Sequence, residues 1–121
     1  VCGSSLGGYY AARAGCYEHR LAAAISHGAI WSVPDMWGNK GDDFGLAMHI
    51  KWVLGASSMR EAHEIMKPFT LEGHLENMQC PYLILHGGHD VLTVSAARQT
   101  YDYAKSHGID VTLRIVETDE T

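Results

Sequence analysis

The sequence predicts an α/β fold with a mostly parallel sheet, flanking helices and one helical insertion. Residues 21–26 and 82–86 are continuous apolar runs, as in parallel strands that are buried on both faces. Residues 111–116 are rich in β-branched side chains, which favour strands. Segments with helical signals separate these runs, so strands and helices alternate along the chain.

The composition is typical of a globular α/β domain. The chain of 121 residues is 46% hydrophobic and 19% charged, with a formal net charge of −5. This acidic balance argues against nucleic acid and membranes as partners, and no apolar run has the length of a membrane-spanning helix. Cys2, Cys16 and Cys80 form neither a C-x-x-C pair nor a disulfide framework. We therefore expect reduced thiols and a cytoplasmic protein.

Two helices are predicted beside the strands, and a glycine marks the end of each. Residues 6–14 precede Gly15, and residues 95–107 precede Gly108. Glycine commonly ends a helix because it adopts the left-handed backbone conformation without a steric penalty. The run over residues 21–26 fits a helix or a strand by its pattern alone, and its small side chains favour a buried strand.

The middle of the chain differs in character from both ends. Residues 29–78 hold all three tryptophans and all five methionines. We interpret this segment as a helical cap insertion that lies over the active edge of the sheet. It separates an N-terminal unit, residues 1–28, from a second α/β unit, residues 79–121.

One helix inside this insertion has clear boundaries. Ser58 and Glu61 match a capping box, in which each side chain bonds the backbone amide of the other residue. The capping box predicts a helix over residues 59–66. Pro68 ends that helix, because proline cannot donate the next backbone hydrogen bond.

The residues Gly3-Ser4-Ser5-Leu6-Gly7 match G-x-S-x-G, a pattern typical of a tight strand-to-helix turn that presents a nucleophilic serine. We predict a strained backbone at Ser5, with no side chain tolerated at Gly3 or Gly7 because it would collide within the turn. The turn places the Ser5 hydroxyl at a helix N-terminus. There the Leu6 amide and the helix dipole would stabilise a developing oxyanion.

Asp90 is the predicted acid partner of Ser5. It follows the strand over residues 82–86 through the turn Gly87-Gly88-His89. In proteins that present a nucleophilic serine on a turn of this kind, the acid comes next in the chain and the histidine last. The acid accepts a hydrogen bond from the imidazole, sets its tautomer and stabilises its cation. The alternative is an ordinary turn aspartate, since aspartate is common in turns.

The catalytic histidine is expected in the loop after the strand over residues 111–116, and no histidine lies there. His19 and His107 do not replace it. Each follows a helix that runs back from the active edge, so each is expected at the opposite edge of the sheet.

The remaining histidines are assigned less direct roles. His86, at a strand end, is predicted to be structural and to donate to a backbone carbonyl. His27 and Trp31 are predicted to contact the substrate, with simple packing as the alternative for Trp31. The spacing His86-x-x-His89-Asp90 suits metal ligands on a helix, but this segment is a strand and a turn. We therefore expect neither a metal nor a cofactor.

Taken in order, four segments resemble a known family. Residues 3–10, 20–26, 69–71 and 80–90 are similar to the α/β-hydrolase group that includes 2,6-dihydroxypseudooxynicotine hydrolase, the fungal polyketide chain-shortening hydrolases and the FrsA-like esterases. The resemblance extends over nearly the whole chain. It implies part of an α/β-hydrolase catalytic domain, with N-terminal strands and a second oxyanion donor before Val1 and the catalytic histidine beyond Thr121.

The resemblance also implies a function. Ser5 would be the nucleophile and Asp90 the triad acid of a serine hydrolase that forms an acyl-enzyme. Members of the group cleave esters, or carbon–carbon bonds next to ketones, in small molecules. We expect a small-molecule carbonyl compound as substrate, and homodimer formation stays open.

Two alternative functions remain. One is a serine peptidase similar to acylaminoacyl-peptidases, which share a serine turn followed by a second glycine. The insertion over residues 29–78 argues against it, because such peptidases have a short connection there. The other is a binding module with a hydrolase fold and no catalysis, and the intact Ser5 and Asp90 argue against it.

Overall fold

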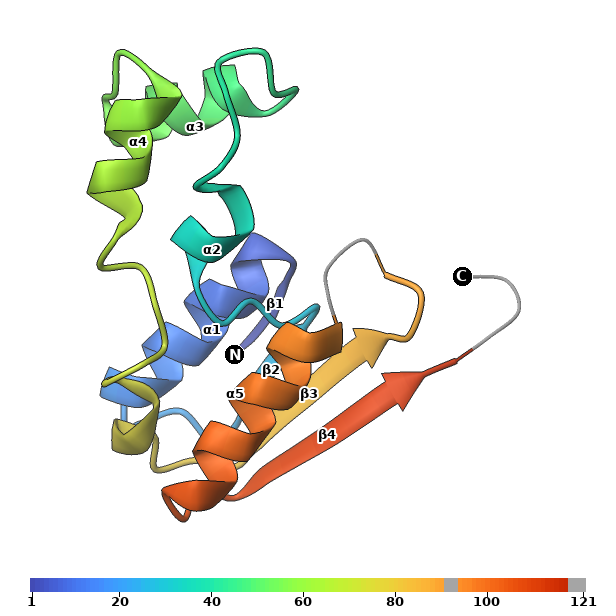
Figure 1. Cartoon of the computed structure of the whole chain (residues 1–121). Coiled ribbons are helices and arrows are strands. Elements are labelled where there is room, and N and C mark those ends of the chain that lie inside the picture. Colours follow the sequence, from blue (N-terminus) through green and yellow to red (C-terminus); the bar gives the residue numbers. More distant parts are fainter. Residues whose placement is uncertain (91–93, 118–121) are drawn as a thin grey trace. The chain divides into compact units, whose positions relative to one another are not determined.

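The computed structural model describes residues 1–90 and 94–117, and these contain a four-stranded parallel sheet (Figure 1). The order of the strands in the sheet is their order in the chain, β1-β2-β3-β4, and every neighbouring pair is parallel. The predicted α/β fold class is therefore confirmed. The strands are β1 (Cys2–Ser4), β2 (Ala24–His27), β3 (Tyr82–Gly87) and β4 (Val111–Val116).

The chain forms two compact units. The sheet unit comprises Val1–Trp31 and Leu71–Thr121, and the second unit is Ser32–Thr70. The second unit falls within the predicted insertion over residues 29–78, whereas residues 71–78 belong to the sheet unit. A role for the second unit as a cap stays a prediction.

Helix α1 (Leu6–Tyr17) connects β1 to β2 and packs closely on β2. A β carbon added at Gly15 would lie 3.1 Å from the Ala24 Cβ, so α1 covers the face of the sheet that carries Ala24. The sequence predicted that Gly15 ends this helix, and that prediction is wrong. The helix continues to Tyr17. Gly15 lies inside it, where the absence of a side chain lets the helix pack close to Ala24 and to the Met78 side chain.

Helix α5 (Val94–Ser106) contacts β3 and β4 on the same face of the sheet. The register pairs Ala24 with Tyr82 and Tyr82 with Val111, so these three side chains share one face, and all are buried. The 3₁₀ helix η1 (Leu75–Asn77) contacts both α1 and α5 and completes this layer.

The opposite face of the sheet carries the alternate residues of each strand. Leu83 and Leu85 of β3 are half-buried, and Thr112 and Arg114 of β4 are exposed. The continuous apolar run in β3 predicted burial on both faces. In β3, the residues on one face (Tyr82, Ile84 and His86) are buried and those on the other face are half-buried.

The predicted boundaries hold well in the second half of the sheet unit. Strand β4 has the predicted bounds, and α5 is shifted by one residue from the predicted 95–107. Gly108 has φ of 73°, so the left-handed stop after α5 is confirmed. Strand β2 begins at Ala24 rather than at residue 21. The preceding residues form a turn in which the Glu18 backbone carbonyl accepts from the Leu21 amide.

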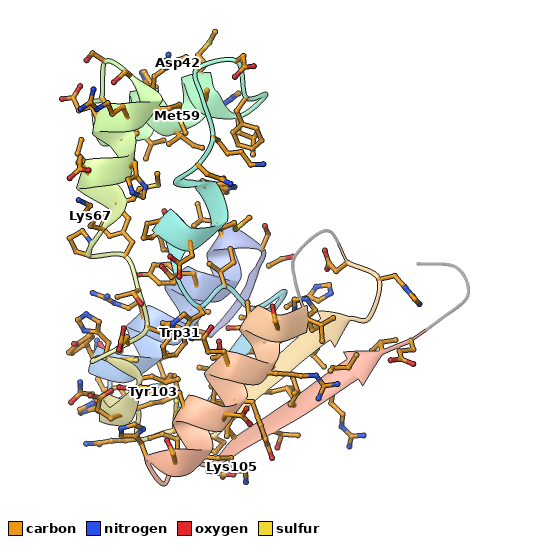
Figure 2. All side chains as sticks on the ribbon, viewed as in Figure 1. Trp31, Asp42, Met59, Lys67, Tyr103 and Lys105 are labelled. Carbon is orange, nitrogen blue, oxygen red and sulfur yellow. The ribbon has the colours of Figure 1, made fainter. Side chains whose placement is uncertain are left out.

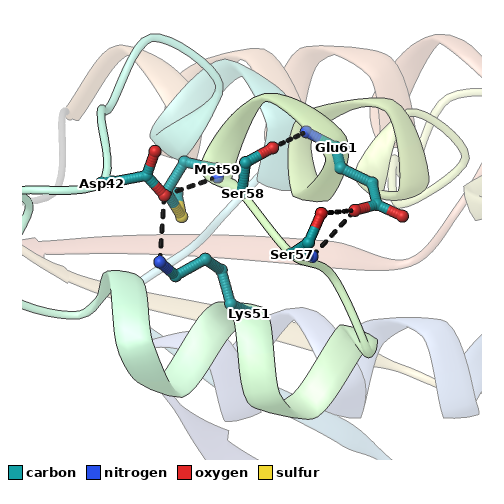
Figure 3. Close-up of polar contacts among 6 residues, drawn as sticks. All are labelled: Asp42, Lys51, Ser57, Ser58, Met59 and Glu61. Atoms are coloured by element: carbon teal, nitrogen blue, oxygen red, sulfur yellow. Dashed lines mark hydrogen bonds and ion pairs between the residues drawn. The ribbon is translucent and has the colours of Figure 1, made fainter.

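The second unit consists of three short helices: α2 (Val33–Trp37), α3 (Ala47–Leu54) and α4 (Met59–Met66). Helix α4 has the predicted bounds. Ser58 Oγ accepts from the Glu61 amide at 3.1 Å, which confirms that half of the capping box (Figure 3). The other half differs, because the Glu61 carboxylate accepts from the amide and the hydroxyl of Ser57, at 2.8 and 2.6 Å, rather than from the Ser58 amide.

One carboxylate joins the helices of the second unit. Asp42 Oδ1 accepts from Lys51 Nζ of α3 and from the Met59 amide at the start of α4, both at 3.0 Å (Figure 3). The hydrogen bond from Lys51, and next the one from the Met59 amide, lower the pKa of the Asp42 carboxyl. The ionised form of Asp42 therefore favours the folded unit.

We expect Asp42→Asn to lower the midpoint of urea unfolding at pH 7, because it weakens both hydrogen bonds. A lowered folded-state pKa contributes stability above the ordinary carboxyl pKa, and this contribution disappears as pH falls through the folded-state value. The wild type and Asp42→Asn should therefore converge at acidic pH. Asp43→Asn is the matched control, since it removes the same charge one residue away. Equal midpoints for the two variants across this pH range would contradict the assignment.

Candidate active site

Ser5 is the single residue between β1 and α1, and its backbone is strained. It has φ of 54° and ψ of −121°, and it is the only residue other than glycine with positive φ in the described ranges 1–90 and 94–117. A side chain at positive φ crowds the backbone and costs on the order of 1–3 kcal/mol. The strained turn that the G-x-S-x-G pattern predicted is therefore present.

The glycines around Ser5 have unequal roles. A β carbon at Gly3 would lie 1.8 Å from the Gly7 carbonyl oxygen, so no side chain fits there. The same prediction for Gly7 is wrong, because a β carbon at Gly7 would meet no described atom within 4 Å. The collision is one-sided: the missing side chain of Gly3 points at the Gly7 carbonyl, while that of Gly7 points away. Gly8 is the second glycine that packing requires, since its β carbon would lie 2.7 Å from the Gly28 carbonyl oxygen.

The turn leaves the Ser5 hydroxyl exposed at the N-terminus of α1. Ser5 is the N-cap residue, yet its side chain makes no capping hydrogen bond. Its amide donates to the His27 carbonyl at 2.8 Å, and its carbonyl accepts from the Gly8 amide at 2.8 Å. The Leu6 amide lies in the first helical turn, where no intrahelical acceptor exists. A hydroxyl and a free amide thus lie together at the positive end of a helix dipole, an arrangement that favours an anion.

Asp90 lies at the same edge of the sheet as Ser5. Strand β3 ends at Gly87, and the Asp90 amide donates to the Gly87 carbonyl at 3.1 Å across the following turn. Because β1 and β3 are parallel, their carboxyl ends meet at one edge, with the end of β2 between them. The adjoining Gly88 is tightly confined, since its β carbon would lie 2.8 Å from the Glu117 Cγ.

His19 and His107 lie at the edge of the sheet opposite to Ser5, as the sequence predicted. His19 follows α1 and His107 follows α5, so both lie at the amino ends of the parallel strands, away from Ser5. His86 is 1% exposed. Its Nδ1 accepts from the Ala29 amide at 3.2 Å, and donation to a backbone carbonyl stays a prediction. The bond holds the loop that follows β2.

The two predicted substrate contacts lie in different surroundings. His27 is exposed, and it alternates with Ser26, so its side chain lies on the face of β2 opposite to α1. Trp31 is 7% exposed, and its ring centroid lies 4.9 Å from that of Tyr103 on α5 (Figure 2). Packing accounts for the Trp31 contacts, and contact of either residue with a substrate stays a prediction.

Two residues that the sequence did not single out lie beneath the turn. Ser26 Oγ donates to the Gly8 carbonyl at 2.7 Å and lies 2.8 Å from the Tyr82 hydroxyl. Burial raises the pKa of Tyr82, so its hydroxyl stays protonated at neutral pH. In the sequence, Ser26 only ends an apolar run and Tyr82 only favours a strand, so neither carried a local signal.

Cys16 is not a competing nucleophile. It is buried in α1, and its Sγ lies 3.1 Å from the Ala12 carbonyl oxygen, to which the thiol donates. Burial raises the pKa of the Cys16 thiol to about 11, so the reactive thiolate is rare at neutral pH.

Within residues 1–90 and 94–117, no three His, Cys, Asp or Glu side chains are grouped so that they could hold a metal ion. None of the helices in those ranges combines the length and the hydrophobicity that crossing a membrane requires.

Solved structures with related folds were found, although no protein-family model and no curated protein matches this sequence. The structure of 2,6-dihydroxy-pseudo-oxynicotine hydrolase superposes with a TM-score of 0.75 at 30% sequence identity, over 98% of this chain and 32% of that one. The chain has the α/β-hydrolase fold. It spans about a third of the length of that neighbour.

Two more distant structures share the hydrolase fold. S-formylglutathione hydrolase (FrmB) from Staphylococcus aureus has a TM-score of 0.57 at 16% identity, over 98% of this chain and 46% of that one. The enol-lactonase from Burkholderia xenovorans LB400 has a TM-score of 0.55 at 18% identity, over 98% of this chain and 56% of that one. At these identities the likeness concerns the fold alone.

We expect Gly3→Ala to unfold the turn and to destabilise the protein by more than about 2 kcal/mol, because a β carbon would overlap the Gly7 carbonyl. Gly7→Ala is the matched control. It places alanine in a helix with open space around it, so we expect a gain of up to about 1 kcal/mol. Urea unfolding measures both effects, and a Gly7→Ala variant as unstable as Gly3→Ala would refute the one-sided collision.

Proposed function

We propose that this protein is a serine hydrolase that cleaves an ester, or a carbon–carbon bond next to a ketone, in a small molecule. The observation that supports this most strongly is the strained Ser5 between β1 and α1, with its hydroxyl exposed and not used for capping. Strain of this kind lowers the stability of the fold. It is therefore found mainly at functional sites, where the surrounding structure enforces it.

In the proposed reaction, Ser5 Oγ attacks the substrate carbonyl carbon and its proton passes to a histidine. We assign that histidine to the part of the protein that follows β4, as the order of the triad requires. The negative charge on the carbonyl oxygen is stabilised by the Leu6 amide and the α1 dipole. Asp90 holds the imidazole in the correct tautomer and stabilises its cation.

The carbonyl–leaving group bond then breaks, and the imidazolium returns the proton to the leaving group. An ester releases an alcohol. A substrate with an adjacent ketone releases a stabilised carbanion, which takes up this proton to give a ketone or its enol. Water, deprotonated by the same histidine, hydrolyses the acyl–Ser5 bond and regenerates the hydroxyl. Both substrate classes share this acyl-enzyme, and neither requires a cofactor.

The similar structures support this choice of chemistry. Each carries a name that describes hydrolysis or lactonase activity, and the one with 30% identity is called 2,6-dihydroxy-pseudo-oxynicotine hydrolase. We therefore propose a small carbonyl compound as the substrate.

A fluorophosphonate probe tests the nucleophile in the full-length protein. We expect labelling of the wild type and none of Ser5→Ala, because the probe phosphonylates only an activated serine. Ser4→Ala is the matched control, since it removes a neighbouring exposed hydroxyl and should keep its labelling. Absence of labelling in a well-folded wild type would favour a binding module without catalysis.

The acid is tested in the same assay. We expect Asp90→Asn to slow labelling by on the order of 10³-fold or more, because an amide does not hold the imidazole in the reactive tautomer. Asp110→Asn removes the same charge just before β4, at the opposite edge of the sheet, and should label at the wild-type rate. Equal rates for the two variants would show that Asp90 is an ordinary turn residue.

A further inference from the structure

Three consecutive residues at the end of β2 contact the turn that carries Ser5. The Ser26 hydroxyl donates to the Gly8 carbonyl, and the His27 carbonyl accepts from the Ser5 amide. The Gly28 carbonyl lies so close to Gly8 that a β carbon there would come within 2.7 Å. The first turn of α1 is thus held by two hydrogen bonds and one close backbone contact, all from one short segment.

The direction of the hydrogen bonds at Ser26 follows from its single hydroxyl proton. Ser26 Oγ donates that proton to the Gly8 carbonyl at 2.7 Å, so it can only accept from its second partner. That partner is the Tyr82 hydroxyl at 2.8 Å, which therefore donates. The result is a directed chain from β3 through β2 to the first turn of α1.

The chain of hydroxyls is closed to water. Ser26 is 0% exposed and Tyr82 is 2% exposed. Hydrogen bonds that water cannot replace hold their geometry more strictly than exposed ones, because a broken bond leaves a buried polar group without a partner.

Gly8 is well placed to transmit this restraint to the reactive groups. It lies three residues after Ser5, and its amide donates to the Ser5 carbonyl at 2.8 Å. A shift of the Gly8 peptide would move Ser5 and the Leu6 amide with it. In a site of this kind, a displacement of about 1 Å costs about 100-fold in rate.

We propose that Ser26 and Tyr82 are positioning residues: their buried hydroxyls hold the first turn of α1 so that Ser5 Oγ and the Leu6 amide keep their reactive geometry. This inference rests on the proposed serine hydrolase function and assigns a role to two residues outside the triad. It also gives β3 two roles, since the strand begins at Tyr82 and leads into the turn before Asp90.

Three variants of the full-length protein separate positioning from stability: Ser26→Ala, Tyr82→Phe and the double variant. Ser26→Ala leaves the Tyr82 hydroxyl buried without its acceptor, so it should be the least stable. The double variant removes the orphaned hydroxyl as well, so we expect its unfolding midpoint to recover to near that of Tyr82→Phe. In both Ser26→Ala and the double variant, the Gly8 carbonyl loses its hydrogen bond from the Ser26 hydroxyl.

Fluorophosphonate labelling gives the second readout, as the maximal rate of inactivation and the probe concentration at half that rate. We expect the maximal rate to fall about 10-fold or more in Ser26→Ala and to stay low in the double variant, despite its recovered stability. Tyr82→Phe keeps the hydrogen bond from Ser26 to Gly8. Its maximal rate of inactivation should therefore lie between the rates of those two variants and that of the wild type. The half-saturating concentration should not change, because probe binding is unaffected.

Thr100→Val is the matched control. Thr100 is also 0% exposed, and its hydroxyl donates to the Ala96 carbonyl of α5 at 2.8 Å, away from Ser5. It should lose stability and keep the wild-type labelling rate. Recovery of the labelling rate in the double variant, or wild-type rates in all folded variants, would overturn the positioning role. Absence of labelling in the wild type and in Thr100→Val would instead overturn the proposed function, and the positioning role with it.

Discussion

The candidate active site depends on one unfavourable backbone conformation, that of Ser5. Positive φ at a serine is not stable by itself. It persists here because the Ser5 amide is bonded to the His27 carbonyl and because Gly8 packs against Gly28. Both contacts come from the end of β2 and the residue that follows it, and β2 pairs with β1 on one side and β3 on the other. The geometry of one reactive hydroxyl is therefore a property of the sheet rather than of the turn.

The parallel sheet also determines which groups meet. Ser5 follows β1 and Asp90 follows β3, so the two reach the same edge although 84 other residues separate them in the chain. Between them, His86 holds the Ala29 amide and so restrains the loop that leaves β2. The covered face of the sheet adds the Ser26–Tyr82 pair below the first turn of α1. Three of the four strands thus contribute to the surroundings of Ser5.

The second unit, Ser32–Thr70, is organised by shorter-range contacts. Helices α2 and α4 begin at the serine caps Ser32 and Ser58, and the Asp42 carboxylate joins α3 to the start of α4. These interactions are polar and partly exposed, in contrast to the buried hydroxyls of the sheet unit. The Ser58 cap was predicted from sequence because its partner lies three residues away, whereas the contacts under Ser5 join distant segments and were not predicted.

Features that depend on local chemistry could be predicted from the amino-acid sequence. The α/β class, β4, α4, the stop at Gly108 and the strained turn at Ser5 follow from periodicity, capping residues and glycine spacing. Which glycines are needed for packing depends on contacts between distant segments and became clear only from the fold. Gly15 continues a helix because it meets Ala24 and Met78, and Gly8 rather than Gly7 is confined because it meets Gly28. The roles of Ser26 and Tyr82 likewise appear only when strands far apart in sequence pair, since hydrogen bonds between distant residues leave no periodic signal.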